Sequence, residues 1–435
     1  MSDRIDTLDV MRGIAVCGIL VVNILVMGTV GSTQGRIYPA AWNADWVAWG
    51  VQRVLFEGQM RGLFTILFGA GMLLMLRKSE GPNGQVAPVD AWTRRCLALL
   101  LFGVVHFAVL MWPGEILWTY GIAGLILLAF RTCRVRTLWI WALAIVACLS
   151  LVRVYESRVD IARGRAAVAG EQARKLGQEP TARQQAALEA AEAAKAAVYP
   201  DPESLAEEVE QRTRFLGLLG WSAGDWAFRH LGRFGWIAVC ESLALMLVGM
   251  ALFRSGILSG DAPARTYWRL LLAGGGIGLA LKLADLAWQA RTGFELDIHR
   301  IDPLMSMLRA AWYQPARLAL TLGYVGTIVL LVRAARWWTP PFRAMGRMAL
   351  TAYTLQSALT SILFYALGYL GAFGAADLVL ITAFVCALIA GFSSMWLRAF
   401  SMGPAEWLLR AIAYGSFSPL RIGRPAPRTD GAPSL

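Results

Sequence analysis

Charged side chains are scarce in this sequence of 435 residues. Only 16% of the residues are Asp, Glu, Lys or Arg, whereas 57% are hydrophobic, and the mean hydropathy is +0.52. A soluble domain carries about a quarter charged residues and could not keep so many apolar side chains away from water. The composition therefore excludes most soluble enzyme folds and nucleic-acid-binding modules, in spite of a net charge of +12. It predicts a polytopic membrane protein.

Metal ligands and nucleotide-binding motifs are lacking as well. The sequence has three histidines, and its six cysteines are scattered without a CxxC spacing. This pattern indicates neither a disulfide framework nor a zinc or haem site, so we predict no metal. The sequence also has no Walker loop, Rossmann glycine pattern, GxSxG elbow or HExxH motif. Energy coupling through nucleotide hydrolysis is not predicted.

Long apolar runs supply the fold instead. A bilayer core of roughly 30 Å requires about 20 apolar residues in a helix, and several of the runs are shorter than that. We predict an all-α fold, a polytopic transmembrane helical bundle of about ten spans. The expected spans are residues 13–30, 62–76, 96–112, 116–130, 137–152, 234–253, 269–289, 313–332, 348–370 and 377–397.

Basic residues are distributed unevenly between the two sets of loops. If the N-terminus is cytosolic, the inside segments hold 21 Lys and Arg, and the short outside loops hold six. The positive-inside rule then predicts a multi-pass protein of the bacterial inner membrane with both termini in the cytosol. This orientation, with attraction to anionic membrane lipids, accounts for the basic charge without any nucleic-acid partner.

One segment differs in composition from all the others. Between Asp160 and Val198 there are 14 alanines in 39 residues, mixed with charged and amide residues that favour helices. A break around Gly177 to Thr181, with Pro180 suited to the first turn of a new helix, predicts a helical hairpin outside the cytosol. The expected division is 1–152, an N-terminal bundle of about five spans; 153–232, the extracytoplasmic insert; 233–420, a C-terminal bundle of about five spans with a cytosolic amphipathic helix; and 421–435, a disordered tail.

Two polar seams run along the first and third spans. Arg12 and Asn23 are eleven residues apart, as are Arg95 and His106, and eleven residues are nearly three helical turns. Asp9 lies one turn before Arg12. Because polar groups in a membrane need a partner or a cavity, we expect the two seams to line one continuous cavity. On a wetted wall, removal of His106 would abolish activity with little loss of stability.

A carboxylate follows the histidine after a Pro113-Gly114 break. Glu115 is nine residues beyond His106 and is expected to fold back over the outer half of its helix. His106 could act as a general base or proton relay, or simply as a hydrogen-bonded packing residue. Weaker candidates lie in later spans, and hydroxyl and amide groups there often only join helices. They are Glu241, the pair Lys282 and Asp285, Arg317, Arg347 and Gln356.

Several blocks resemble one family in order along nearly the whole chain. Residues 5–23 (IDTLDVMRGIAVCGILVVN), 63–71 (LFTILFGAG), 106–120, 345–357 (MGRMALTAYTLQS) and 403–410 (GPAEWLLR) are similar to the YeiB-like family of uncharacterised bacterial inner-membrane proteins. That family is described by a domain of unknown function. The alanine-rich insert has no evident counterpart in it.

The opening block is also similar to that of membrane acyltransferases of the heparan glucosaminide acetyltransferase type. The shared positions are Asp9, Arg12 and Gly13. Such enzymes pass an acyl group from cytosolic acyl-CoA to a sugar hydroxyl or amine on the far side, using an essential histidine. Residues 31–61 contain no histidine here, so the resemblance leaves that role to His106.

The leading hypothesis is therefore a transmembrane acyltransferase with acyl-CoA as donor and a glycan or small molecule as acceptor. In it, His106 deprotonates the acceptor and Glu115 orients the imidazole or holds the acceptor. The donor and substrate site would draw on Asp9, Arg12, Asn23, Arg95, Arg347 and Gln356, with the arginines meeting the CoA phosphates. A transporter or exporter with a buried relay, such as Lys282 and Asp285, and a non-catalytic membrane organiser remain alternatives. A homo-oligomer also remains open.

Overall fold

The computed structural model describes residues 6–31, 43–77, 86–292 and 302–421, and these residues are nearly all helical. The predicted all-α fold is confirmed. The helices are α1 (Asp6–Gly28), α3 (Ala44–Val51), α4 (Gln59–Leu76), α5 (Pro88–Leu110), α6 (Leu117–Leu127), α7 (Val135–Lys175), α8 (Ala182–Val198), α9 (Pro202–Thr213), α10 (Phe215–His230), α11 (Arg233–Arg254), α12 (Ala264–Arg269), α13 (Gly276–Thr292), α14 (Pro303–Ala334), α15 (Thr339–Arg347), α16 (Ala349–Ser361), α17 (Ala375–Ala399) and α18 (Pro404–Tyr414). Short π turns join α3 to α4 and α12 to α13.

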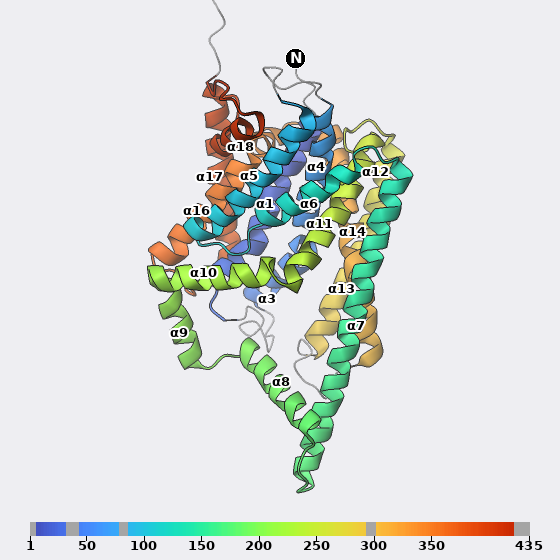
Figure 1. The fold of residues 1–435 in the computed structure, drawn as a ribbon, viewed down its shortest axis with the longest axis vertical. Helices are drawn as coiled ribbons and strands as arrows, with labels where there is room; N and C mark the ends of the chain where they lie inside the picture. Colours follow the sequence, from blue (N-terminus) through green and yellow to red (C-terminus); the bar gives the residue numbers. More distant parts are fainter. Residues whose placement is uncertain (1–5, 32–42, 78–85, 293–301, 422–435) are drawn as a thin grey trace, which may run out of the picture.

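Eight helical segments in the described ranges are long and apolar enough to cross a membrane. They correspond to eight of the ten expected spans. The other two expected spans are shorter helices, Leu117–Phe130 and α16 with the π turn Ile362–Ala366 that continues it. The protein is thus a helical membrane bundle, and its two ends are distinct in Figure 1. We call the end with α18 and the start of α5 the terminal end, and the end with α8 and α9 the insert end.

The insert begins inside a helix rather than after one. α7 continues without a break from residue 135 to residue 175, which at 1.5 Å per residue is about 60 Å, twice the hydrocarbon core. Its second half projects beyond the other long helices in Figure 1 and pairs with α8. The expected hairpin is therefore formed, but Pro180 lies before the cap: Thr181 and Gln184 form the capping box of α8.

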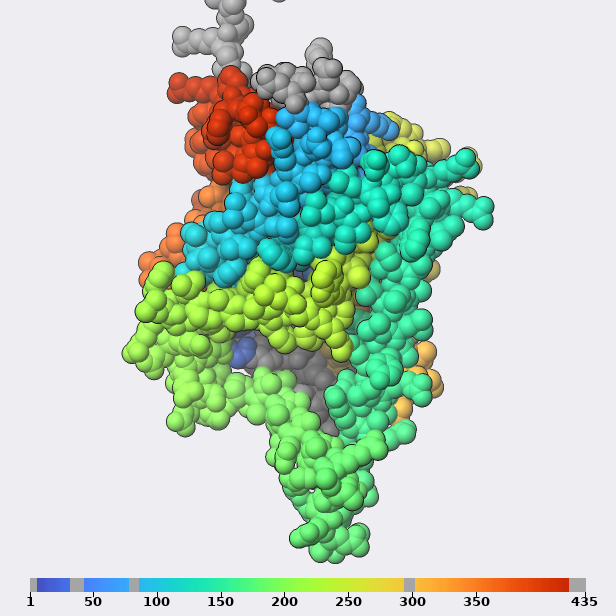
Figure 2. Space-filling view, viewed as in Figure 1, coloured from blue at the N-terminus to red at the C-terminus, as the bar shows by residue number. Residues whose placement is uncertain are grey.

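α9 and α10 return the chain from the hairpin to the bundle. Figure 2 shows α10, in yellow-green, as a band beneath α5 and α6. Arg212 of α9 is buried and donates to the carbonyl oxygens of Thr29 at 2.9 Å and Met27 at 3.0 Å. These carbonyls end α1 and have no partner within a helix, so the guanidinium satisfies them and holds the insert to the bundle.

Two glycines allow a close helix crossing near the terminal end. A Cβ atom added to Gly13 of α1 would overlap the carbonyl group of Phe342 in α15, and one added to Gly346 would overlap the carbonyl oxygen of Asp9. The two backbones can touch only because neither residue has a side chain. This crossing places Arg12 and Arg347, the neighbours of the two glycines in sequence, on the same region of the bundle.

The predicted division of the chain at residues 152 and 232 stays a prediction. Its last part, the tail, falls almost wholly on residues 422–435, which lie outside the described residues.

Candidate functional site

A cavity of about 410 Å³ opens near the terminal end of the bundle. It lies between α1, α4, α5, α6, α15, α16 and α18, so segments from both halves of the chain form its wall. Four arginines from four different helices line it: Arg12, Arg95, Arg347 and Arg410. The structure thus brings together all three arginines that the sequence suggests for a phosphate site, and adds a fourth.

Arg12 is held by the residue one turn before it. Its Nη1 donates to Oδ1 of Asp9 at 2.9 Å, and the Asp9 side chain is only 6% exposed. Both residues line the cavity. The i,i+3 pair read from the sequence is present, and it fixes the Arg12 guanidinium while cancelling its charge.

Arg95 has no such counter-ion among the described residues. The structure gives it neither a hydrogen bond nor an ion pair there, and its buried Nε has no partner. The guanidinium lies 5.9 Å from the centre of the Phe68 ring, a distance at which cation–π attraction supplies part of its stabilisation. A cavity-lining arginine that is not paired with a carboxylate is suited to bind an anion.

The second carboxylate of the cavity is engaged by backbone. Oε1 of Glu406, in α18, accepts from the amides of Leu350 at 2.6 Å and Thr351 at 3.2 Å, and Oε2 accepts from Thr351 Oγ1 at 2.6 Å. Glu406 therefore caps the N-terminus of α16 and docks α18 on the bundle. Burial raises the pKa of its carboxyl group above the ordinary value. With four arginines and two carboxylates, the cavity carries an excess of positive charge.

The rest of the cavity wall is largely aromatic and apolar. It includes Phe64, Phe68, Trp92, Tyr120 and Tyr353. The indole of Trp92 donates to the carbonyl oxygen of Gly124 at 2.9 Å, so its polar edge is satisfied and its ring remains as an apolar surface. A positive mouth that leads to an apolar interior suits a molecule with an anionic group at one end and an apolar chain at the other.

His106 lies behind this wall, not on it. It is 2% exposed, its Nε2 is 2.9 Å from Ser357 Oγ, and its ring stacks on Tyr353 with the ring centres 5.0 Å apart. Tyr353 lines the cavity, and His106 does not. The expectation that the imidazole sits on a wetted wall needs correction: because the ring is packed and hydrogen-bonded, we expect its truncation to alanine to reduce stability.

Glu115 is paired with a different histidine. Its Oε2 accepts from the amides of Leu117 at 2.5 Å and Trp118 at 3.1 Å, which caps the start of α6. Its Oε1 lies 3.4 Å from Nε2 of His230 in α10 and accepts from the indole of Trp226 at 3.1 Å. Burial raises the pKa of this carboxyl group. No contact between Glu115 and His106 is present among the described residues.

Two further predicted residues lie away from the cavity. Asn23 is half-buried on α1 and does not line it. Gln356 is buried, and its Nε2 donates to the carbonyl oxygen of Val16 at 3.2 Å, which ties α16 to α1. The cavity thus ends before Asn23 and His106. Of the two polar seams predicted from the sequence, only the ends that carry Arg12 and Arg95 line the cavity.

The relay suggested for a transporter has other partners. Asp285 Oδ1 accepts from Nε of Arg309 at 2.6 Å, and Oδ2 accepts from Gln289 at 2.6 Å. Lys282 lies instead 5.9 Å from the ring centre of Tyr313. Among the residues that the structure describes, no group of three His, Cys, Asp or Glu side chains is placed to hold a metal ion.

Sequence reasoning missed the roles of Arg410, Tyr353 and His230. Arg410 belongs to the amphipathic helix α18. In this helix Trp407 donates to the carbonyl oxygen of Ser418 at 2.8 Å, beyond its own helix, and Leu409 is buried against the bundle. The spacing of Glu406 and Arg410, four residues apart, was the one signal that both lie on one face.

Fold and site together define a class: a polytopic helical membrane protein with an arginine-lined cavity at one end. The profile of the family described as "Protein of unknown function (DUF418)" matches residues 252–416. The chain is 32% identical to "Uncharacterized protein YxaH" of Bacillus subtilis (strain 168), over 96% of each chain. It is 27% identical to "Uncharacterized protein YeiB" of Escherichia coli (strain K12), over 96% of this chain and 98% of that protein.

The chain therefore belongs to the YeiB-like family, as its sequence blocks predict. The names of these relatives assign no reaction. No solved structure matches the chain.

Proposed function

We propose that this protein is a transmembrane acyltransferase whose cavity binds acyl-CoA. The observation that carries the proposal is the convergence of Arg12, Arg95 and Arg347 on one cavity with an aromatic interior. The helices that carry these arginines are far apart in sequence, so the arginines come together only in the folded protein. The proposed localisation is the bacterial inner membrane.

The proposed orientation places this cavity on the cytosolic side. In the sequence, the expected inside segments hold 21 basic residues and the short outside loops hold six, and Arg12, Arg95 and Arg347 of the inside segments line the cavity at the terminal end. Acyl-CoA is a cytosolic metabolite, so an opening at this end is the one from which it can enter. The orientation and the donor site support each other.

The size of the cavity limits which part of the donor it can enclose. At about 410 Å³ it is near the lower end of ligand pockets, which measure roughly 300–1,000 Å³. We propose that the cavity encloses the acyl-thioester arm of acyl-CoA. The phosphates would then lie at the mouth of the cavity, against the arginines, and the adenine would lie outside. Arg95, which lacks a carboxylate partner among the described residues, is the principal phosphate contact.

The reaction needs a nucleophile, a base and a leaving thiol. The acceptor hydroxyl oxygen attacks the thioester carbonyl carbon, a C–O bond forms, and the C–S bond breaks. The hydroxyl proton passes to a base and then to the departing thiolate, which leaves as CoA thiol. We assign the base to His106, which enters the cavity only when the Tyr353 side chain that stacks on it moves aside.

Binding and transfer are tested on the full-length protein in lipid nanodiscs. Affinity for CoA, dephospho-CoA and pantetheine is measured by calorimetry for the unmodified protein, Arg95→Gln and Arg94→Gln. Arg94 is exposed and precedes Arg95 on the same helix, so it controls for a general loss of positive charge. A charged hydrogen bond contributes about 1.5–3 kcal/mol, so Arg95→Gln should weaken CoA binding by roughly 10- to 100-fold.

Arg94→Gln should leave the affinity within about twofold, and pantetheine should bind both variants alike. Release of CoA thiol from acetyl-CoA then measures turnover, with and without sugar acceptors. Equal CoA affinity in Arg95→Gln and Arg94→Gln, or no thiol release with any acceptor, would overturn the proposal.

A further inference from the structure

A second cavity of about 250 Å³ lies on the insert side of the first. Its wall is built by Arg61 of α4, by the turn and first residues of α6, by the end of α10 and by the start of α11. It shares Ile116 and Tyr120 with the first cavity. The two cavities therefore approach each other from opposite ends of the bundle, with these two side chains as a common wall.

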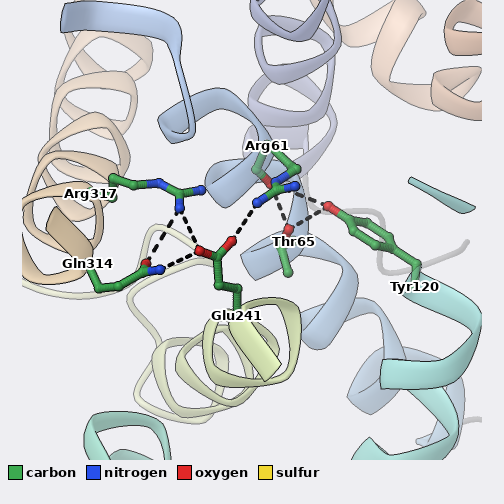
Figure 3. Close-up of polar contacts among 6 residues, drawn as sticks. All are labelled: Arg61, Thr65, Tyr120, Glu241, Gln314 and Arg317. Carbon is green, nitrogen blue, oxygen red and sulfur yellow. Dashed lines mark hydrogen bonds and ion pairs between the residues drawn. The ribbon is translucent and has the colours of Figure 1, made fainter. Parts of the chain in front are cut away.

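The charge of this second cavity comes from a buried cluster of which only Arg61 lies on the cavity wall. Glu241 accepts from Arg61 Nη2 at 2.6 Å through Oε2 and from Arg317 Nη1 at 2.9 Å through Oε1. Gln314 also donates to the same carboxylate. Figure 3 shows Glu241 between the two guanidinium groups. Two arginines share one carboxylate, so the cluster retains one positive charge.

That charge faces the cavity through Arg61. The side chains of Glu241 and Arg317 are 7% and 8% exposed, whereas that of Arg61 is 35% exposed and lines the cavity. Only Nη2 of Arg61 is used by Glu241, which leaves its other N–H groups for a ligand. In the same cluster, Tyr120 Oη lies 2.5 Å from Thr65 Oγ1 and donates to the Arg61 carbonyl oxygen (Figure 3). The shared wall is thus anchored to the cluster.

The other ionisable groups of the cavity already have protein partners. Arg229 pairs with Asp225 at 2.6 Å. Both ring nitrogens of His230 face oxygen acceptors: Nδ1 is 2.9 Å from the Trp226 carbonyl oxygen, and Nε2 is 3.0 Å from that of Glu115. Nε2 also lies 3.4 Å from Oε1 of Glu115, so the imidazole and this carboxyl group already have protein partners.

We propose that this second cavity binds a small anion, a carboxylate- or phosphate-bearing molecule of about monosaccharide size, against Arg61. An anion there completes the charge balance of a cluster that is otherwise positive inside the bundle. That the ligand is the acyl acceptor rests on the proposed acyltransferase function, whereas its binding does not. The acceptor would then be an acidic sugar or a phosphorylated small molecule.

Calorimetry on the full-length protein in nanodiscs tests this with three probes: glucuronate, glycerol 3-phosphate and glucose. The two anions separate carboxylate from phosphate ligands, and glucose is the neutral control for glucuronate. We expect at least one anion to bind the unmodified protein about tenfold or more tightly than glucose. This comparison needs no variant, so it decides the charge preference even if a substitution impairs folding.

Two variants then separate the two cavities. Arg61→Gln leaves Glu241 paired with Arg317 and Gln314, and should weaken the anion by about tenfold or more with CoA affinity unchanged. Arg95→Gln should weaken CoA binding and leave the affinity for the anion unchanged. Arg61→Lys should retain most of the anion affinity. Anion binding no tighter than glucose, or unaffected by Arg61→Gln, overturns this inference while CoA binding stands. If the unmodified protein binds the anion but not CoA, the proposed function is overturned instead.

Discussion

Replacement of Glu241 by glutamine would remove the one carboxylate that two arginines share. Glutamine keeps the shape and one acceptor oxygen, but it leaves Arg317, 8% exposed, without a counter-ion. Loss of one partner from a buried ion pair costs about 3–5 kcal/mol, because the remaining charge stays away from water. At about 1.4 kcal/mol per factor of ten, the folded-to-unfolded ratio should fall roughly a hundredfold or more.

A set of matched variants isolates this cause. Arg61→Gln keeps the buried pair between Glu241 and Arg317 and removes the more exposed arginine, so it should cost only about 1 kcal/mol. The double variant Glu241→Gln/Arg317→Gln removes both buried charges and should recover part of the loss. Unfolding of each purified protein in the same detergent, followed by circular dichroism against denaturant, gives the free energies of unfolding.

Two results would refute this reasoning. One is a Glu241→Gln protein as stable as the unmodified one, which would mean that the Arg317 charge is solvated. The other is a double variant less stable than Glu241→Gln alone, which would mean that the hydrogen bonds of Arg317, not its charge, stabilise the bundle.

Three further predictions concern the first cavity. Gly13→Ala should destabilise by about 1–3 kcal/mol and weaken CoA binding, whereas Gly391→Ala, where an added Cβ meets nothing within 4 Å, should be neutral or stabilising in the same denaturant series. Burial raises the pKa of the Glu406 carboxyl group above its ordinary value, so protonation favours the folded state. The melting temperature of the unmodified protein relative to that of Glu406→Gln should therefore be highest at a pH below the ordinary pKa of a glutamate, and it should fall as pH rises through the raised pKa. Under the proposed mechanism, His106→Gln should lower single-turnover acyl transfer by about 10²-fold or more at unchanged CoA affinity, and Ser357→Ala should have a smaller effect.

The position of basic residues at the ends of apolar runs predicted the arginines of the first cavity, because they lie near helix ends at one side of the membrane. Arg12 and Arg95 fall at the start of two apolar runs, and the charge asymmetry places both starts on the same side. Arg347 opens another run on that side. The depth of a residue along the bundle can thus be predicted from a single sequence. Depth alone was enough to predict that these three arginines lie near each other.

Rotation about each helix axis could not be read in the same way. His106 lies eleven residues after Arg95, yet it points to Ser357 and Tyr353 of α16, behind the cavity wall. The direction of a side chain depends on which helices flank its own, and in a membrane span the side chains that face lipid are as apolar as those that face other helices. For the same reason the pairing of Glu115 with His230, from the insert, had no signal in sequence spacing.

The shortness of α6 explains how two cavities can share a wall of two side chains. Its 11 residues span about 17 Å, little more than half of the hydrocarbon core. A helix this short begins within the bundle, where water does not satisfy its first amides, and the Glu115 carboxylate accepts from two of them. α10 then covers that buried start through Trp226 and His230. The carboxylate that caps α6 therefore also shapes the second cavity. For this reason Glu115→Gln should weaken anion binding in two ways, by shifting α6 and by removing a charge.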